Sequence, residues 1–298
     1  MNHRLGVLAM LGAVAIYGAN FAISRHALTH GLTPDDLVAM RYGIAGILLL
    51  PVFAVRGAAT CAGVGWRRGI LLAVMSGVPM ALLMNTGLSL APASHGAAIG
   101  PGTVTVIGVV GGAAMFGARP SRPALFGIAV VLVGLALIGI AGSRGGGPST
   151  LAGDAFFLAT GLLWGLYPLL LQKWNVGAMT STAIVSVLSL VYVPIYALAL
   201  EPRIFAVDPW VAAFHALNQG LLNVILGLWL WGYAVRALGA AQAQRFPPLI
   251  PVAGTLLAIP ILGEWPPPLQ AAGVALIVAG LGIAAFGSIG AAAARRDE

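Results

Sequence analysis

The feature that most constrains this chain is the length of its segments that contain no charged residue. Residues 69–118 include no Asp, Glu, Lys or Arg, and several further stretches are 18 residues or longer. Charged residues make up 8% of the 298 residues, whereas soluble domains carry about 25%. So few charges exclude a soluble enzyme and a disordered chain. The chain is therefore predicted to be an integral membrane protein.

These stretches predict α-helices. A spanning helix needs roughly 20 apolar residues, and open strand edges are not viable in lipid. Barrel strands would alternate over segments of about ten residues, which are shorter than the runs seen here. The first run, of 20 residues, also exceeds the about 7–15 apolar residues of a signal peptide. We expect residues 69–118 to hold two helices that separate near Ala91-Pro92-Ala93-Ser94. The sequence thus predicts an all-α fold of ten transmembrane helices, at 5–25, 35–55, 69–90, 94–116, 122–142, 152–173, 179–200, 209–235, 240–262 and 266–290.

Positive charges predict the orientation of these helices. With ten spans, both termini lie on one side, and that side would carry ten of the 15 Lys and Arg residues against three on the other. Both termini are therefore expected in the cytoplasm. The acids expected on the outer side are Asp35, Asp36, Asp154, Glu201, Asp208 and Glu264.

The remaining composition excludes several partners. The net charge of +7 comes from scarce acids, and the basic residues are spread singly, so no nucleic-acid partner is expected. The single cysteine, Cys61, excludes a disulfide framework and a multi-cysteine metal site. No cofactor is expected. An intramembrane enzyme is disfavoured because Ser94 and His95 are adjacent on a helix, where their side chains point about 100° apart. A membrane-embedded binding or assembly subunit stays open as an alternative.

The chain shows signs of an internal duplication. The Gly-rich segment 144–149 predicts a flexible linker between one unit at 1–143 and a second at 150–298. An odd number of helices in each unit would invert the second unit relative to the first, as in secondary transporters that bind their substrate near the bilayer midplane. An offset of 146 residues pairs Pro101 with Pro247, Gly108 with Gly254, Gly117 with Gly263, Pro120 with Pro266, Gly127 with Gly273 and Gly134 with Gly280.

Three short motifs carry a resemblance to a known family. Tyr17-Gly18 and Trp164-Gly165 lie in the first helix of each half, and Ile261-Leu262-Gly263-Glu264 closes the ninth helix. With the five-plus-five plan, they resemble the EamA-type drug/metabolite transporter superfamily, and within it the YddG-like bacterial exporters of aromatic amino acids. The resemblance implies ten helices, cytoplasmic termini, a bacterial inner membrane and export of small metabolites through a central cavity. Gly117-Ala118-Arg119 departs from the Gly-Glu pattern, which weakens any role for a symmetric pair of acids.

Polar and aromatic residues at mid-depth are the candidates for a substrate site, because placing them in lipid is costly. Tyr17 and Asn20 share one face of the first helix, and Trp164 and Tyr167 lie mid-way along the sixth. Gln219 and Asn223 form an i, i+4 pair on the eighth helix. The alternative for all of them is helix–helix contact, with hydrogen bonds worth about 0.6 kcal/mol on average.

Two further groups complete the predicted site. Pro101 in the fourth helix and Phe246-Pro247-Pro248 in the ninth occupy matching positions and predict broken helices at the site. The third helix offers Met80, Met84 and Asn85, although methionine is usually core filler.

Three charged or titratable residues in or near the spans have predicted roles in charge pairing, substrate binding or proton transfer. Arg245 either snorkels to the cytoplasmic surface or attracts a substrate carboxylate, and Arg41 is expected to pair with Asp35 and Asp36. His95 is the candidate for a proton-linked step. Because no acid falls in the middle of a predicted span, a facilitator is favoured over an ion-coupled pump.

The inverted halves predict an alternating-access carrier of small metabolites. The resemblance implies that it exports amino acids, and the aromatic candidates fit aromatic or bulky apolar side chains. The alternative is a proton-coupled exporter of lipophilic cations, which would use the aromatic side chains for cation–π contacts. The expected partners are the small-molecule substrate and membrane lipid. The oligomeric state stays open, and a monomer is compatible with all of these features.

Overall fold

The computed structural model describes residues 3–117, 119–243 and 246–294, and its regular elements there are all helical. The first half contains α1 (His3–Thr29), α2 (Pro34–Val55), the short 3₁₀ helix η1 (Ala58–Thr60), α3 (Trp66–Ser76), α4 (Val78–Leu90), α5 (Ala93–Phe116) and α6 (Arg122–Gly145). The second half contains α7 (Gly147–Trp174), α8 (Ala178–Ser189), α9 (Tyr192–Ala199), α10 (Pro209–Ala216), the π-helix η2 (Leu217–Leu226), α11 (Gly227–Leu238), α12 (Ala240–Ala243), α13 (Leu249–Leu262) and α14 (Pro268–Ala294).

The described residues form nine helical segments that are long and apolar enough to cross a membrane. Three of these segments combine neighbouring elements, namely α3 with α4, α8 with α9, and α10 through η2 to α11. The tenth apolar helix is α13, which has only 14 residues. The chain is thus an all-helical membrane protein with nine to ten candidate spans.

Local sequence explains where several helices begin and end. Thr33 caps α2 by accepting the Asp36 N–H, and Asp36 in turn accepts the Thr33 N–H at 2.7 Å, which satisfies both amides in a capping box. Gly117 ends α5 and Gly263 ends α13, each in the left-handed conformation, with φ of 65° and 69°. Glycine adopts this conformation without strain. The two glycines paired by the 146-residue offset therefore end equivalent helices in the same backbone conformation.

The structure corrects three local predictions. Segment 144–149 is not a flexible linker, because α6 and α7 are separated by Gly146 alone, and φ of +68° at Gly147 permits the sharp reversal. The predicted break at Pro101 is absent, since α5 is continuous through it. The predicted third helix is instead interrupted, at Gly77.

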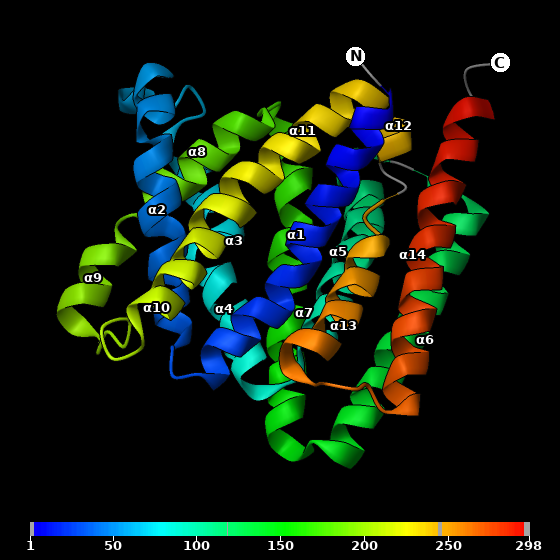
Figure 1. Cartoon of the computed structure of the whole chain (residues 1–298). Helices are drawn as coiled ribbons and strands as arrows, with labels where there is room; N and C mark the ends of the chain where they lie inside the picture. The colour runs from blue at the N-terminus through cyan, green and yellow to red at the C-terminus, as the bar shows by residue number, and fades with distance from the viewer. Residues whose placement is uncertain (1–2, 118, 244–245, 295–298) are drawn as a thin grey trace.

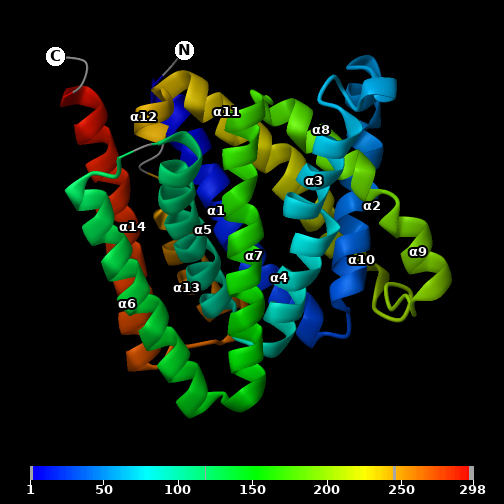
Figure 2. The same cartoon turned by 180° about the vertical axis from the view of Figure 1, so that it is seen from behind.

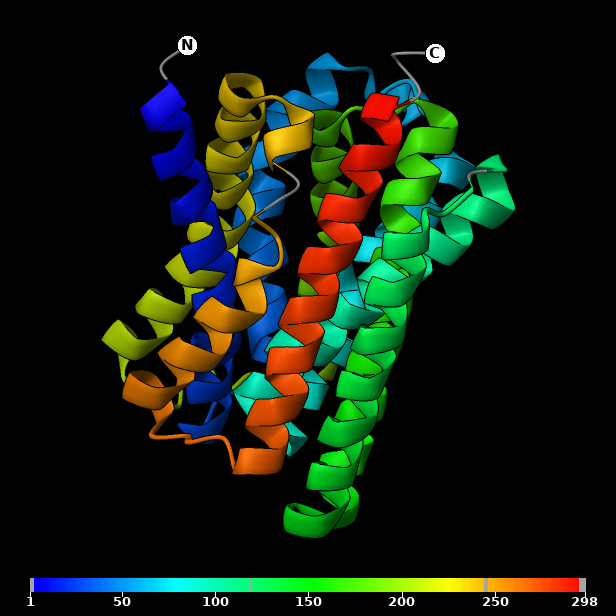
Figure 3. The same ribbon diagram turned by 90° about the vertical axis from the view of Figure 1, so that its right-hand side faces the viewer.

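The two halves are interlocked instead of standing side by side. Helices α6 and α14 run antiparallel along one side of the molecule (Figures 1 and 3). A Cβ atom on Gly127 would lie 2.6 Å from the Gly280 carbonyl oxygen, and one on Gly134 would lie 2.7 Å from the Gly273 oxygen. Because the offset pairs Gly127 with Gly273 and Gly134 with Gly280, exchanging the halves maps one contact onto the other.

The same exchange relates the inner helices. Gly18 of α1 packs on Ala253 of α13, and Gly165 of α7 packs on Ile107 of α5. Ile107 and Ala253 are also 146 residues apart. The first helix of each half therefore packs against the fourth spanning helix of the other half: α1 against α13, and α7 against α5. Figure 2 shows α5 and α7 side by side from behind.

Helix α1 begins and α14 ends at the same end of the molecule, which is uppermost in Figure 1. We call this the upper end, and the opposite end the lower end. The turns from α1 to α2, from α4 to α5 and from α13 to α14 lie at the lower end (Figure 1).

Replacing Gly127 by alanine should destabilise the protein, because the added Cβ would press on a backbone oxygen of α14. We expect Gly127→Ala to lower the unfolding temperature in detergent micelles, at a cost of about 1–3 kcal/mol. Gly139→Ala on the same helix is the matched control, since a Cβ there meets no heavy atom within 4 Å. Equal unfolding temperatures for the two variants would contradict a close α6–α14 contact.

Candidate functional site

A cavity of about 580 Å³ lies between the two halves. It is bounded by α1, α5, α7, α11, α14 and the segment before α13, and it reaches the upper end at Ala178, the first residue of α8. Its lining comprises Tyr17, Pro101, Val104, Thr105, Trp164, Tyr167, Pro168, Ala178, Leu228, Trp231, Pro247, Pro248, Ile250, Leu281 and Ala285. The wall is therefore mostly apolar with a few polar groups, which is typical of small-molecule sites.

Four aromatic side chains dominate this wall. Tyr17 and Trp231 face each other with ring centroids 6.1 Å apart and planes inclined by 54°. Trp164 and Tyr167 come from the part of α7 that Gly165 holds against α5. Flat apolar surfaces from both halves thus meet in one cavity.

Trp231 is a wall residue that sequence reasoning did not single out. It lines the cavity together with Leu228, one turn earlier on α11. Trp229 points elsewhere, with 57% of its surface exposed. The i, i+3 spacing of Leu228 and Trp231 was the available signal, but a single sequence does not show which face of a wholly apolar helix points inward.

A buried polar cluster lies on the lower side of Tyr17. Its centre is the Asn20 side-chain oxygen, which accepts hydrogen bonds from the amides of Asn218 at 3.3 Å and Asn223 at 2.9 Å, and from the Ser24 hydroxyl at 3.3 Å. Gln219 donates to Ser24 at 2.7 Å. Asn20, Gln219 and Asn223 therefore meet in one cluster, but they are not part of the described cavity lining.

The cluster depends on a ten-residue π-helix. In η2 the backbone hydrogen-bonding period is longer than in an α-helix. The Asn223 side-chain amide donates to the Asn218 backbone carbonyl at 3.0 Å. This winding brings Asn218, Gln219 and Asn223 to the same buried side, facing α1 and α2. The α-helical spacing used in the sequence analysis could not reveal Asn218. Such π segments are frequent at functional sites.

Arg41 contacts this cluster, which corrects the predicted pairing with Asp35 and Asp36. Its Nε donates to the Gln219 side-chain oxygen at 2.9 Å. The two acids are held elsewhere, since Tyr192 donates to Asp35 and Tyr196 donates to Asp36. Arg41 therefore carries its charge into the membrane-spanning part of the molecule.

The lower end of the molecule is closed by polar contacts. Arg25 forms an ion pair with Glu264 at 2.6 Å and donates to the Leu88 carbonyl, and the second Glu264 oxygen accepts the Ala93 N–H at 2.9 Å. Gln270 donates to Ser94 nearby. These contacts connect α1, α4, α5 and the turn before α14 below the cavity.

His95 belongs to this lower end and not to the cavity. Its Nδ1 lies 2.7 Å from a carboxylate oxygen of Asp154, and both side chains are buried. Asp154 was expected at the outer surface, but the reversal at Gly146 and Gly147 turns it inward against α5. Its Oδ2 atom has no hydrogen-bond partner among the described residues.

The remaining predicted residues are not brought to the cavity wall. Met80 and Asn85 are buried in α4, where Asn85 donates to the Ala81 carbonyl at 2.8 Å. Met84 and Phe246 are partly buried and pack against core side chains. Arg245 lies outside the residues that the structure describes.

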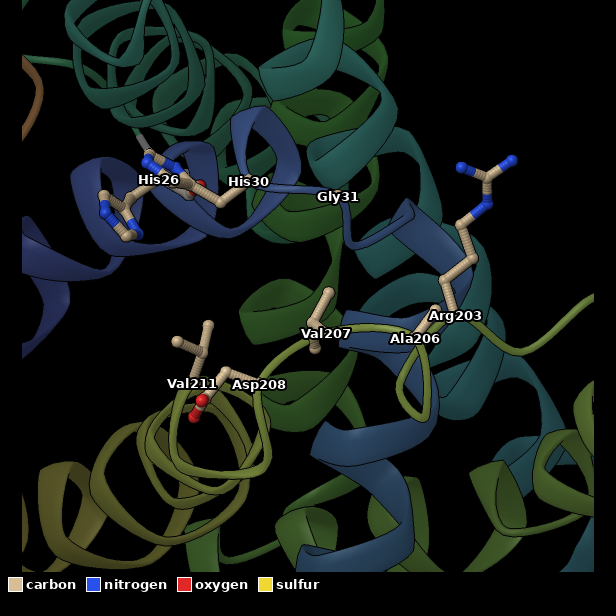
Figure 4. Close-up of a pocket in the computed structure, with 8 residues that line it drawn as sticks. All are labelled: His26, His30, Gly31, Arg203, Ala206, Val207, Asp208 and Val211. Carbon is tan, nitrogen blue, oxygen red and sulfur yellow. The ribbon is translucent and has the colours of Figure 1, made fainter.

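A second hollow, of about 400 Å³, opens at the lower end between α1 and the segment before α10 (Figure 4). His26 and His30 stack there with ring centroids 3.9 Å apart. Val207, Asp208 and Val211 lie across from them in Figure 4. It shares no lining residue with the cavity.

Comparison with known proteins agrees with this architecture. The pattern of the EamA-like transporter family matches residues 4–140 and again residues 151–286, which indicates a duplication. A probable terminal-alkyne amino-acid exporter of Streptantibioticus cattleyicolor is 30% identical over 262 residues, covering 80% of this chain and 83% of the relative. A probable amino-acid metabolite efflux pump of Salmonella typhimurium is 26% identical, covering 96% of both. A solved crystal structure superposes with a TM-score of 0.59 at 21% identity, covering 96% of this chain and 98% of that one, and it supports the fold alone. The chain belongs to the EamA-like transporter family and is a transporter, not an enzyme.

Proposed function

We propose that this transporter exports amino acids with aromatic or bulky apolar side chains, together with related small metabolites. The observation that carries the proposal is the cavity between the halves, whose walls are aromatic and whose closed end adjoins a cluster of amides. An aromatic side chain fits the wall around Trp164 and Trp231. The side-chain amides of the adjoining cluster can both donate and accept hydrogen bonds, as the amino and carboxylate groups of a zwitterion require. The names of the two relatives, an amino-acid exporter and an amino-acid metabolite efflux pump, support this substrate class.

Transport would proceed by alternating access. We take residues 1–143 and 150–298 as inverted repeats, which is supported by the antiparallel glycine contacts between α6 and α14. The excess of Lys and Arg on the upper side favours cytoplasmic termini in a bacterial inner membrane. In this orientation the cavity opens to the cytoplasm while Arg25 and Glu264 close the outer end, so substrate would enter first from inside.

The proposed transporter works as a facilitator. The described lining of the cavity contains no carboxylate, and buried carboxylates are the usual ion-coupling groups. The His95–Asp154 pair is the alternative proton-linked element, because it is buried at the closed end. A monomer suffices, since one chain supplies the whole cavity wall, and exposed apolar residues such as Leu48, Phe126 and Leu198 would face lipid.

Replacing Trp231 by alanine should reduce transport, because it removes an aromatic ring that lines the cavity beside Tyr17. We expect efflux of radiolabelled L-phenylalanine from proteoliposomes to fall by roughly tenfold or more, as at other buried aromatic contacts. Trp229→Ala is the matched control, since this ring is largely exposed on the same helix. Equal rates in the two variants would remove Trp231 from the substrate path.

The same liposomes test the other parts of the proposal. Accumulation of phenylalanine under an imposed pH gradient would contradict a facilitator. If a lipophilic cationic dye moves while no amino acid does, the protein is instead an exporter of cations that binds them by cation–π contacts.

Replacing Glu264 by glutamine should open the outer end more often, because the ion pair with Arg25 is lost. In a Ser94→Cys background we expect faster labelling by a membrane-impermeant thiol reagent added to intact cells, since Ser94 is 3% exposed in the closed end. Glu201→Gln, an exposed acid of the same side, is the control and should leave the rate unchanged. Unchanged labelling in Glu264→Gln would mean that this ion pair does not hold the outer end closed.

A further inference from the structure

Arg41 is a permanently charged side chain inside a membrane-spanning helix. It is the eighth residue of α2, about 10 Å from the start of the helix at 1.5 Å per residue. Arginine keeps its proton in proteins. A charge at this depth is costly, and such residues face cavities or paired groups and mark substrate paths.

Arg41 has the neutral neighbours Gln219 and Tyr42, and no counter-ion among the residues that the structure describes. Among the described residues the two ion pairs are Arg25 with Glu264 and His95 with Asp154. Asp36 of the same helix is occupied by Thr33, by Tyr196 and by the Arg203 N–H at 3.0 Å. Arg41 is thus uncompensated by a carboxylate of the described chain.

The neighbours of Arg41 cannot supply the missing negative charge. Gln219 accepts from Arg41 and donates to Ser24, and the Asn20 oxygen accepts from Ser24, Asn218 and Asn223. All of these groups are neutral amides or a hydroxyl. The cluster as a whole therefore carries one positive charge.

The polar cluster connects this charge to the helix that lines the cavity. Tyr17 of α1 lines the cavity, and Arg41 donates to Gln219, which in turn donates to Ser24 two turns below Tyr17 on the same helix. Tyr17 also shares one face of α1 with Asn20 and Ser24, which belong to the cluster. A ligand with its apolar part among the cavity aromatics and its other end on the Asn20 side of Tyr17 would point towards the cluster that contains Arg41.

We propose that Arg41 binds the carboxylate of the substrate, so that the transported species must carry a free carboxylate beside its apolar side chain. This inference rests on the proposed amino-acid export and specifies its chemistry. The guanidinium has five N–H donors, of which Nε–H donates to Gln219. Arginine and a carboxylate form short, charge-assisted hydrogen bonds, which are stronger than bonds between neutral groups. The same charge repels a lipophilic cation.

The test compares two ligands that differ only in the carboxylate, L-phenylalanine and L-phenylalaninamide. Binding to the purified full-length protein in detergent is measured by isothermal titration at about pH 6.5, where the α-amino groups are largely protonated. We expect the wild type to bind phenylalanine more tightly than the amide. In Arg41→Gln the Kd of phenylalanine should rise roughly tenfold or more, while the Kd of the amide stays unchanged or falls.

Two further variants complete the design. Arg203→Gln removes an exposed arginine of the lower end and should leave both Kd values unchanged. Arg41→Lys keeps the charge without the planar donor geometry and should retain part of the preference for phenylalanine. It also keeps the test decisive if Arg41→Gln does not fold.

The outcomes separate this inference from the proposed function. Equal wild-type affinity for both ligands, or an equal loss of both in Arg41→Gln, would overturn the role of Arg41 and leave amino-acid export standing. If the wild type binds neither ligand, amino-acid export itself fails and this inference fails with it.

Discussion

The close approach of helices at glycine positions is the constraint on which the cavity depends. Lipid tails are as apolar as leucine, so helices in a membrane associate through van der Waals packing and interhelical hydrogen bonds, with small residues at the contact. Gly127 and Gly134 let α6 and α14 touch along their backbones, Gly18 lets α1 pack on α13, and Gly165 lets α7 pack on α5. Because these contacts connect opposite halves, each half supplies one wall of the space between them.

The sequence was sufficient for features that depend on long-range composition. Charge-free runs located the spans, and the offset of 146 residues identified Gly117 and Gly263, which end equivalent helices in the same left-handed conformation. Three of the four aromatic wall residues, Tyr17, Trp164 and Tyr167, are also among the candidates that the sequence singles out, whereas Trp231 is not. In these cases the residue type alone carries the physical information, through hydropathy or through backbone freedom.

The remaining features depend on the rotation and winding of the helices, which hydropathy does not encode. An apolar helix has no contrast between its faces, so Trp229 and Trp231 look alike until the structure shows which one faces Tyr17. The π-helix adds Asn218 to the pair of Gln219 and Asn223, and the tight turn at Gly146 buries Asp154 against His95. Arg41 was assigned to the nearest acids in sequence, yet it donates to Gln219, which is 178 residues away.

The proposed alternating access requires the lower end to open, and the ion pair there opposes this only weakly. The Arg25–Glu264 pair is partly exposed, with relative side-chain exposures of 18% and 24%, and pairs of this kind contribute about 0–1 kcal/mol. Apolar packing also holds this end, because Leu88 of α4 is fully buried and Leu28 of α1 and Ile261 of α13 pack against the same core. Each buried leucine or phenylalanine contributes about 1.5–3 kcal/mol, which is more than the ion pair contributes. The proposed opening of the lower end must therefore separate this packing as well as the ion pair, and a bound ligand can drive it only by as much as its affinity differs between the two states.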